Sequence, residues 1–114
     1  SPDKDKVLTA SMVNNYVKHG YLTKPDKKKY QRQQIARLIA ITTLKSVFSI
    51  QDIAQTLNTL QSQASSEQLY DAFVDYMNHE IDPANPIIQS SCQTVKLYHQ
   101  TLDLIHHTQE EVSR

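Results

Sequence analysis

Glycine, cysteine and long apolar segments are scarce in this chain. One glycine occurs among 114 residues, whereas hairpin-rich folds need glycine at turns with positive φ, which argues against a β-sandwich or a barrel. A single glycine also excludes a glycine-rich phosphate loop. The lone cysteine, Cys92, cannot form an internal disulfide, so nothing indicates an oxidising compartment. No apolar run approaches the roughly 20 residues that cross a bilayer, and we expect a cytoplasmic protein without a membrane partner.

Residue types that favour helices fill the periodic stretches of the sequence. Leu, Ile, Gln, Ala and Lys dominate these stretches, which predicts an all-α fold. A chain of this length forms one domain that buries roughly 65% of its unfolded surface. We expect helices over residues 10–19, 31–47, 50–60, 65–81 and 86–111.

Capping residues mark the ends of several expected helices. Thr9 is a suitable N-cap for the first helix, and Gly20 stands where a left-handed C-terminal residue is wanted. Ser65 and Gln68 form a candidate capping box for the fourth helix. Residues 82–86 contain two prolines, which interrupt the chain before the last helix.

Residues 21–30 place apolar and aromatic residues on either side of a basic tip. The dipeptide Pro25-Asp26 is a turn former, and three lysines follow it. We expect a small hairpin or an extended wing whose two ends, Leu22 and Tyr30, pack inward.

Two of the expected helices carry distinctive apolar patterns. The second is apolar or neutral around much of its circumference and should be central to the core. Its positions are Ile35, Leu38, Ile39, Ile41, Thr42 and Leu44. The last helix has a near-heptad seam made of Ile88, Cys92, Val95, Tyr98, Leu102 and Ile105. This seam is either the packing face of an intramolecular bundle or a surface that pairs with a helix of another chain.

Charge is divided unevenly along the chain. Residues 1–45 contain ten of the twelve Lys and Arg residues and carry a net charge of +7, whereas residues 46–114 carry −7. The overall balance of zero therefore hides a polarised molecule. Such a division is typical of a protein that binds a polyanion with one half. The alternative is that the acidic half only offsets the basic half within one folded unit.

Several short motifs between Thr9 and Leu60 follow one another in a recognisable order. They are the run Val13-Asn14-Asn15-Tyr16-Val17-Lys18-His19-Gly20-Tyr21-Leu22, the pair Lys29-Tyr30, the core Ile35-Ala36-Arg37-Leu38 and the step Phe48-Ser49-Ile50-Gln51-Asp52-Ile53. In this order they resemble the winged helix-turn-helix head of MerR-type transcription regulators. The segment from Leu8 to Ile53 is also similar to the centre of an uncharacterised bacterial family called domain of unknown function 1836.

The sequence departs from the MerR-type pattern in three places. Asn14 and Asn15 stand where the pattern has Arg and Tyr, and Gln31 stands where it has Ser or Thr at the cap after the wing. The pattern also has a helix before the recognition helix. Only about eight residues precede Thr9, so that leading helix is expected to be missing from this chain or to lie upstream of it.

The resemblance implies a division of the chain into three segments. These are a flexible N-terminal segment (1–8), a winged helix-turn-helix head (9–60) and a helical C-terminal region (61–114) for dimerisation or for an effector. The implied protein is a transcription regulator that binds double-stranded DNA as a homodimer through its last two helices. A small-molecule or protein effector is possible in principle, but the sequence does not identify it.

The resemblance also assigns roles within the head. Residues 10–19 would be the recognition helix in the major groove, and residues 23–29 would be the wing. The expected DNA-binding residues are Ser11, Asn14, Asn15, Tyr16, Lys18, Lys27, Lys28 and Lys29. Asn pairs bidentately with adenine, whereas the wing lysines would contact phosphates without reading sequence. Tyr16 is expected to be half core and half phosphate donor.

The sequence contains no recognisable catalytic or metal-binding constellation. His99 and His106 are separated by about 10.5 Å of helical rise, too far to chelate one ion together. Cys92 lies on the apolar seam and is expected to be a small buried hydrophobe. We therefore expect no enzymatic activity, no cofactor and no metal.

Two other kinds of function are compatible with the same residues. One is a protein-interaction module, in which the acidic, seam-bearing C-terminal half docks another protein. The other is a ligand-sensing regulator with an apolar pocket between residues 66–81 and 86–111.

Overall fold

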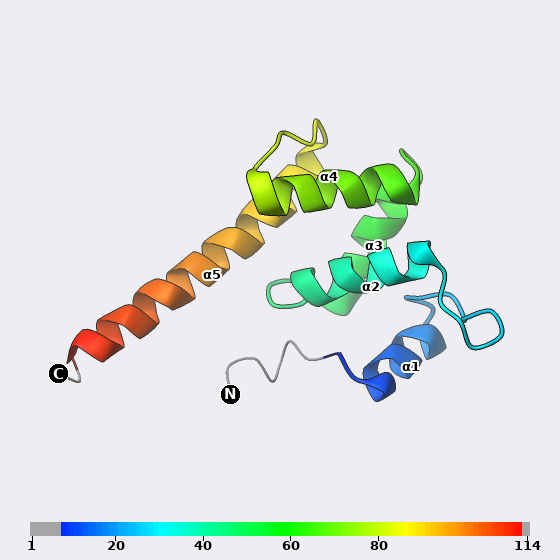
Figure 1. Cartoon of the computed structure of the whole chain (residues 1–114), viewed down its shortest axis with the longest axis horizontal. Coiled ribbons are helices and arrows are strands. Elements are labelled where there is room, and N and C mark those ends of the chain that lie inside the picture. The colour runs from blue at the N-terminus through cyan, green and yellow to red at the C-terminus, as the bar shows by residue number, and fades with distance from the viewer. Residues whose placement is uncertain (1–7, 113–114) are drawn as a thin grey trace.

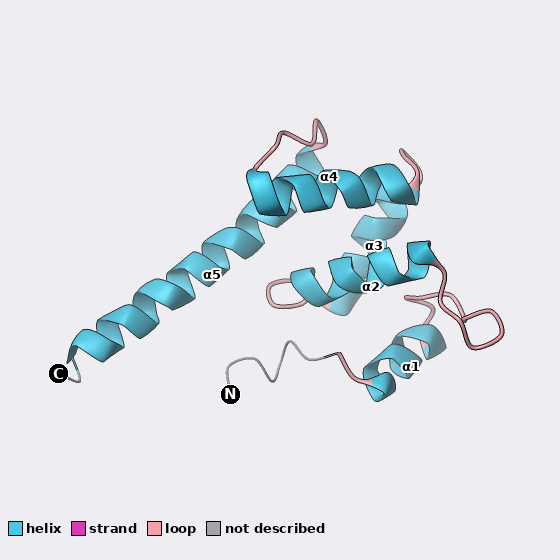
Figure 2. Cartoon of the chain, viewed as in Figure 1, coloured by secondary structure: helices cyan, strands magenta, loops and turns pink. Residues whose placement is uncertain are grey.

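The computed structural model describes residues 8–112, which contain five α-helices and no β-strand (Figures 1 and 2). The helices are α1 (Ala10–Lys18), α2 (Arg32–Leu44), α3 (Ile50–Gln61), α4 (Ser66–His79) and α5 (Pro86–Val112). The predicted all-α class is therefore confirmed. Most of the expected flexible segment 1–8 lies outside the described residues.

Side-chain caps start the helices where the sequence predicts. Thr9 Oγ1 accepts a hydrogen bond from the Met12 amide at 3.2 Å. Ser65 and Gln68 form the expected capping box, in which each side chain accepts from the other residue's backbone amide. Each cap satisfies amides that the first helical turn leaves without an intrahelical partner.

α1 ends one residue earlier than predicted, and two other helices end at least two residues early. α2 stops at Leu44 rather than at residue 47, because a tight turn follows and Ser49 adopts the extended conformation that caps α3. α4 stops at His79 rather than at Ile81, because Glu80 adopts a left-handed conformation with a φ of 54°. The pattern of apolar side chains alone does not predict where α2 and α4 end.

The core forms around α2, which packs against α3, α4 and α5. Leu38, Ile41 and Leu44 of α2 are buried as expected. The prediction was wrong for Ile35 and Ile39, whose side chains are 48% and 40% exposed. They lie in a groove between the starts of α2 and α4, where no other described element covers them.

α5 divides into a packed half and a projecting half. Ile88, Cys92 and Val95 are buried against the rest of the chain, so this part of the predicted seam packs within the molecule. The remainder extends away from the body (Figure 1), with Tyr98 and Ile105 exposed. The radius of gyration is consequently 15.9 Å, compared with about 13 Å for a compact domain of 100 residues. Among residues 8–112, each helix is either too short or too polar to cross a membrane.

Candidate nucleic-acid interface

α1 has one solvent face and one core face. Ser11, Asn14, Asn15 and Lys18 are exposed and recur at the spacing that places them on a single side of a helix. We call these four residues the α1 stripe. The opposite side packs on the core through Met12, Val13, Tyr16 and Val17. The predicted recognition residues of α1, other than Tyr16, are thus brought together on one accessible surface.

Tyr16 belongs to the core rather than to this surface. Its side chain is only 8% exposed, and burial raises the pKa of its phenol because the charged form is poorly solvated there. The core half of its expected role is confirmed. The phosphate-donor half is not supported, since so little of the side chain reaches solvent.

The end of α1 is set by Gly20. This residue has a φ of +77°, and its amide donates to the Val17 carbonyl at 3.1 Å while the Tyr21 amide donates to the Tyr16 carbonyl at 2.8 Å. These two bonds form a Schellman motif. The motif turns the chain so that the following Leu22 is buried in the core.

Residues 23–29, here called the wing, form a minimal hairpin. Backbone hydrogen bonds join Asp26 and Lys29 in both directions, at 3.0 and 2.8 Å, and these two residues make the only bridge within the described part of the chain. The central residues of the turn, Lys27 and Lys28, have φ values of 49° and 65°. Positive φ at both central positions is the signature of a type I′ turn. The predicted hairpin is thus reduced to its turn, with Tyr30 packed against the core.

This turn places lysines where glycine or asparagine is favoured. A left-handed conformation costs an ordinary L-residue roughly 1–2 kcal/mol, because its Cβ approaches the following carbonyl. Both lysine side chains are exposed, so no burial of their aliphatic parts offsets this cost. The wing therefore presents two cations at the expense of local stability.

Two side chains of α2 hold the wing and the end of α1. Gln34 is buried, and its Nε2 donates to the Thr23 carbonyl, the Thr23 hydroxyl and the Lys24 carbonyl, each at 2.9 Å. Arg37 donates through Nε to the Tyr21 carbonyl at 2.8 Å and through a terminal nitrogen to Asn58 at 3.0 Å. Sequence reasoning missed Gln34 entirely. Arg37 belongs to the motif Ile35-Ala36-Arg37-Leu38, but its hydrogen bonds to Tyr21 and Asn58 were not predicted.

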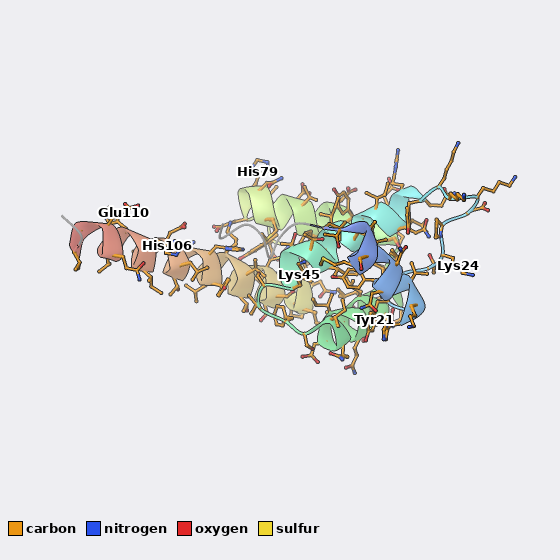
Figure 3. All side chains as sticks on the ribbon, turned by 90° about the horizontal axis from the view of Figure 1, so that it is seen from below. Tyr21, Lys24, Lys45, His79, His106 and Glu110 are labelled. Carbon is orange, nitrogen blue, oxygen red and sulfur yellow. The ribbon has the colours of Figure 1, made fainter. Side chains whose placement is uncertain are left out.

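The cations of residues 8–45 form no ion pair with a carboxylate in the described part of the chain. Within residues 8–112, ion pairs join Lys96 to Glu80 and His107 to Glu111, and neither pair involves the first two helices. α1 and the wing lie side by side at the end of the molecule away from the tip of α5 (Figures 1 and 3), and Lys24 extends from this end. Unpaired cations on one end produce a positive field that attracts polyanions.

The remaining candidate groups offer little chemistry. In the described part of the chain, no three His, Cys, Asp or Glu side chains converge in a way that could hold a metal ion. Cys92 is fully buried, and burial raises the pKa of its thiol to about 11. A cavity of about 60 Å³ lies between α2, α3, α4 and α5, with Leu69, Phe73 and Ile88 in its lining. This volume holds a few waters at most.

The chain belongs to the family described as Domain of unknown function (DUF1836), whose profile matches residues 1–73. The matched segment includes α1, the wing, α2, α3 and the first half of α4. No curated protein and no solved structure matches the chain. The family assignment therefore covers the whole of the surface formed by the α1 stripe and the wing, whereas α5 lies outside it.

Proposed function

We propose that this protein is a transcription regulator that binds double-stranded DNA through the α1 stripe and the wing. In this proposal α1, the wing, α2 and α3 form a MerR-like winged helix-turn-helix head. The order of a helix, a turn of basic residues and two further helices supports the assignment. The exposure of Asn14 and Asn15 supports it as well, because groove-reading side chains must be accessible.

The observation that carries the proposal is the left-handed Lys27-Lys28 turn. Strained backbone that persists without a packing reason is a basis for inferring function. Lysine differs from the favoured glycine and asparagine chiefly in its positive charge. Since no carboxylate in residues 8–112 pairs with these cations, the charge is available for a phosphate.

The two parts of the surface would have different tasks. α1 would enter the major groove, where Asn14 or Asn15 can pair with the N6 and N7 atoms of adenine. Lys27, Lys28 and Lys29 would contact the phosphate backbone and fix the register of α1 without reading bases. Lys18, at the end of the α1 stripe, would add a further phosphate contact.

The projecting half of α5 supports a homodimer. Its exposed apolar side chains are Leu97, Tyr98, Leu104, Ile105 and Val112, which we call the α5 stripe. Apolar residues at near-heptad spacing on an unpacked helix are suited to pair with a second helix. A dimer would present two heads to two half-sites, as symmetric DNA-binding proteins do.

The test is a titration of duplex DNA at several salt concentrations, followed by fluorescence anisotropy. We expect log K to fall linearly with log salt, with a slope that reports several phosphate contacts. Replacement of Lys27, Lys28 and Lys29 with Ala should reduce the slope by about three. The matched control replaces the same three lysines with Arg, which keeps the charge and should keep the slope. An absence of binding at low salt would reject the proposal.

A protein-interaction module is the second candidate, and the α5 stripe is the observation that favours it. In that case the stripe would dock a different protein, and the head would not bind DNA. Light scattering after size exclusion separates the two cases, because a homodimer forms without any partner. A monomer that binds no duplex would favour the interaction module.

A further inference from the structure

One turn of α2 contacts both the wing and the segment that joins α1 to the wing. Gln34 bonds to Thr23 and Lys24 at the base of the wing. Arg37, three residues later on the same side of the helix, bonds to the carbonyl of Tyr21 just after α1. Both contacts flank Leu22, whose side chain is buried in the core.

The bonds of Gln34 use both ends of its side-chain amide. The amide nitrogen donates to wing carbonyls, while Oε1 accepts from the Gln31 amide at 2.5 Å. The first turn of α2 and the base of the wing are therefore held by one buried group. Loss of its donors would leave the partly buried carbonyls of Thr23 and Lys24 without these partners, which is unfavourable.

Arg37 joins three segments rather than neutralising a charge. Its guanidinium contacts a backbone carbonyl and the Asn58 side chain of α3, and it forms no salt bridge within residues 8–112. Partial burial lowers the pKa of this guanidinium, because solvation of the charge is reduced. A planar group with several fixed donors can make both bonds at once, whereas a lysine ammonium cannot reproduce that geometry.

We infer that Gln34 and Arg37 act together as positioning residues that fix the distance between the α1 stripe and the wing. We call the pair the α2 clamp. The inference rests on the proposed function, since it assigns the clamp a role in DNA binding. A wing that bears strained lysines contributes phosphate contacts only where it is held in register with α1. Neither residue needs to touch DNA for this effect.

The first arm of the test measures the spacing without DNA. A nitroxide on Lys28→Cys reports its distance to α1 amides by paramagnetic relaxation in NMR spectra. Cys92 is buried and should not take up the label in the folded protein. The variants are Gln34→Glu and Arg37→Lys, and circular dichroism establishes that each remains folded.

Gln34→Glu provides a pH-dependent readout. At pH 8 the new carboxylate can still accept from Gln31 but faces the wing carbonyls without a proton to donate. We expect the relaxation pattern on α1 to weaken as the wing loosens. Burial beside carbonyl oxygens should raise the pKa of the new carboxyl, so its protonated form regains one donor as the pH falls to 5. The pattern should then recover relative to the parent chain at the same pH. A role in packing alone would not give this recovery.

The second arm measures the salt dependence of duplex binding for the same variants. Gln34→Glu at pH 8 should lower the slope by at least half of the decrease that Lys27, Lys28 and Lys29→Ala causes, with recovery at pH 5. Arg37→Lys should also lower the affinity although it keeps the charge. A parent-like affinity of Arg37→Lys would mean that Arg37 acts only as a cation, which overturns its positioning role.

The outcomes separate the clamp from the proposed function. If the relaxation pattern is unchanged in both variants, Gln34 and Arg37 do not fix the spacing between α1 and the wing. This holds whatever the result of the DNA titrations. If the label shows a loosened wing but the salt slope stays like that of the parent, the role of the clamp in DNA binding is overturned. This conclusion requires that the triple Ala variant lowers the slope. If the parent chain binds no duplex, the proposed function and the clamp's role in binding fail together. The label measurements alone then decide whether α2 sets the spacing.

Discussion

Replacing Lys27 with Asn and Lys28 with Gly should make the protein more stable and a weaker DNA binder. The two positions have φ values of 49° and 65°, which Asn and Gly adopt with little strain. Relief at two positions should add about 1–2 kcal/mol to the free energy of unfolding, after allowance for the greater unfolded entropy of Gly. A gain of this size raises Tm by roughly 5–10 °C in a chain of this length.

The same substitutions remove two proposed phosphate contacts. Each contact contributes about 0.9 to the slope of log K against log salt, so the slope should fall by about 1.8. At 0.1 M salt this corresponds to a roughly 60-fold loss of affinity from counterion release. The assays are thermal unfolding by circular dichroism and anisotropy titration of one duplex over a range of salt concentrations.

The control keeps both charges and both strained positions. Lys27→Arg with Lys28→Arg should leave Tm and the salt slope close to those of the parent. If the Asn-Gly variant gains stability but binds DNA as the parent does, the lysines do not contact phosphate. If it loses stability, the account of the turn as a strained type I′ hairpin is wrong.

Three further outcomes follow from the structure. Gly20→Ala should lower the free energy of unfolding by about 1 kcal/mol. The cause is backbone strain alone, because φ is +77° and no atom lies within 4 Å of the added Cβ. A thermal melt that matches that of the parent would refute this. Cys92 should resist alkylation at pH 8 until the chain unfolds. Because its folded pKa of about 11 exceeds the ordinary thiol value of 9.0, stability should fall as the pH rises from about 9 to about 11. The variant Cys92→Ala should lack that part of the alkaline decline. Leu104→Glu with Ile105→Glu should convert a dimer into a monomer in light scattering while the melting temperature stays within a few degrees, since both side chains are already exposed in the single chain.

Much of the fold could be predicted because its signals are local. Thr9, Ser65 and the prolines of segment 82–86 determine helix ends through backbone bonds and φ restrictions, which a sequence displays directly. The exposure of Ile35 and Ile39 could not be predicted in the same way. Their burial depends on which neighbour covers each side of α2, and that information lies in tertiary packing rather than in periodicity.

The candidate surface shows the same division between local and non-local signals. The exposed face of α1 follows from helical spacing, so Asn14 and Asn15 were placed correctly on an accessible side. The near-complete burial of Tyr16 was not predicted, because the degree of burial depends on contacts with distant residues. Gln34 carries no sequence signal for its contact with the wing. A glutamine in a helix is ordinarily solvent-exposed, and only the fold places the wing carbonyls within its reach.

The most direct test of the central claim maps a bound duplex onto the protein by amide chemical shifts. We expect perturbations to concentrate on residues 10–19 and 23–29, with few changes in the projecting half of α5. Their disappearance at high salt would accord with an electrostatic contribution from the lysines. Shifts confined to α4 and α5, or no shifts at low salt, would contradict the assignment of the α1 stripe and the wing as the DNA-binding surface.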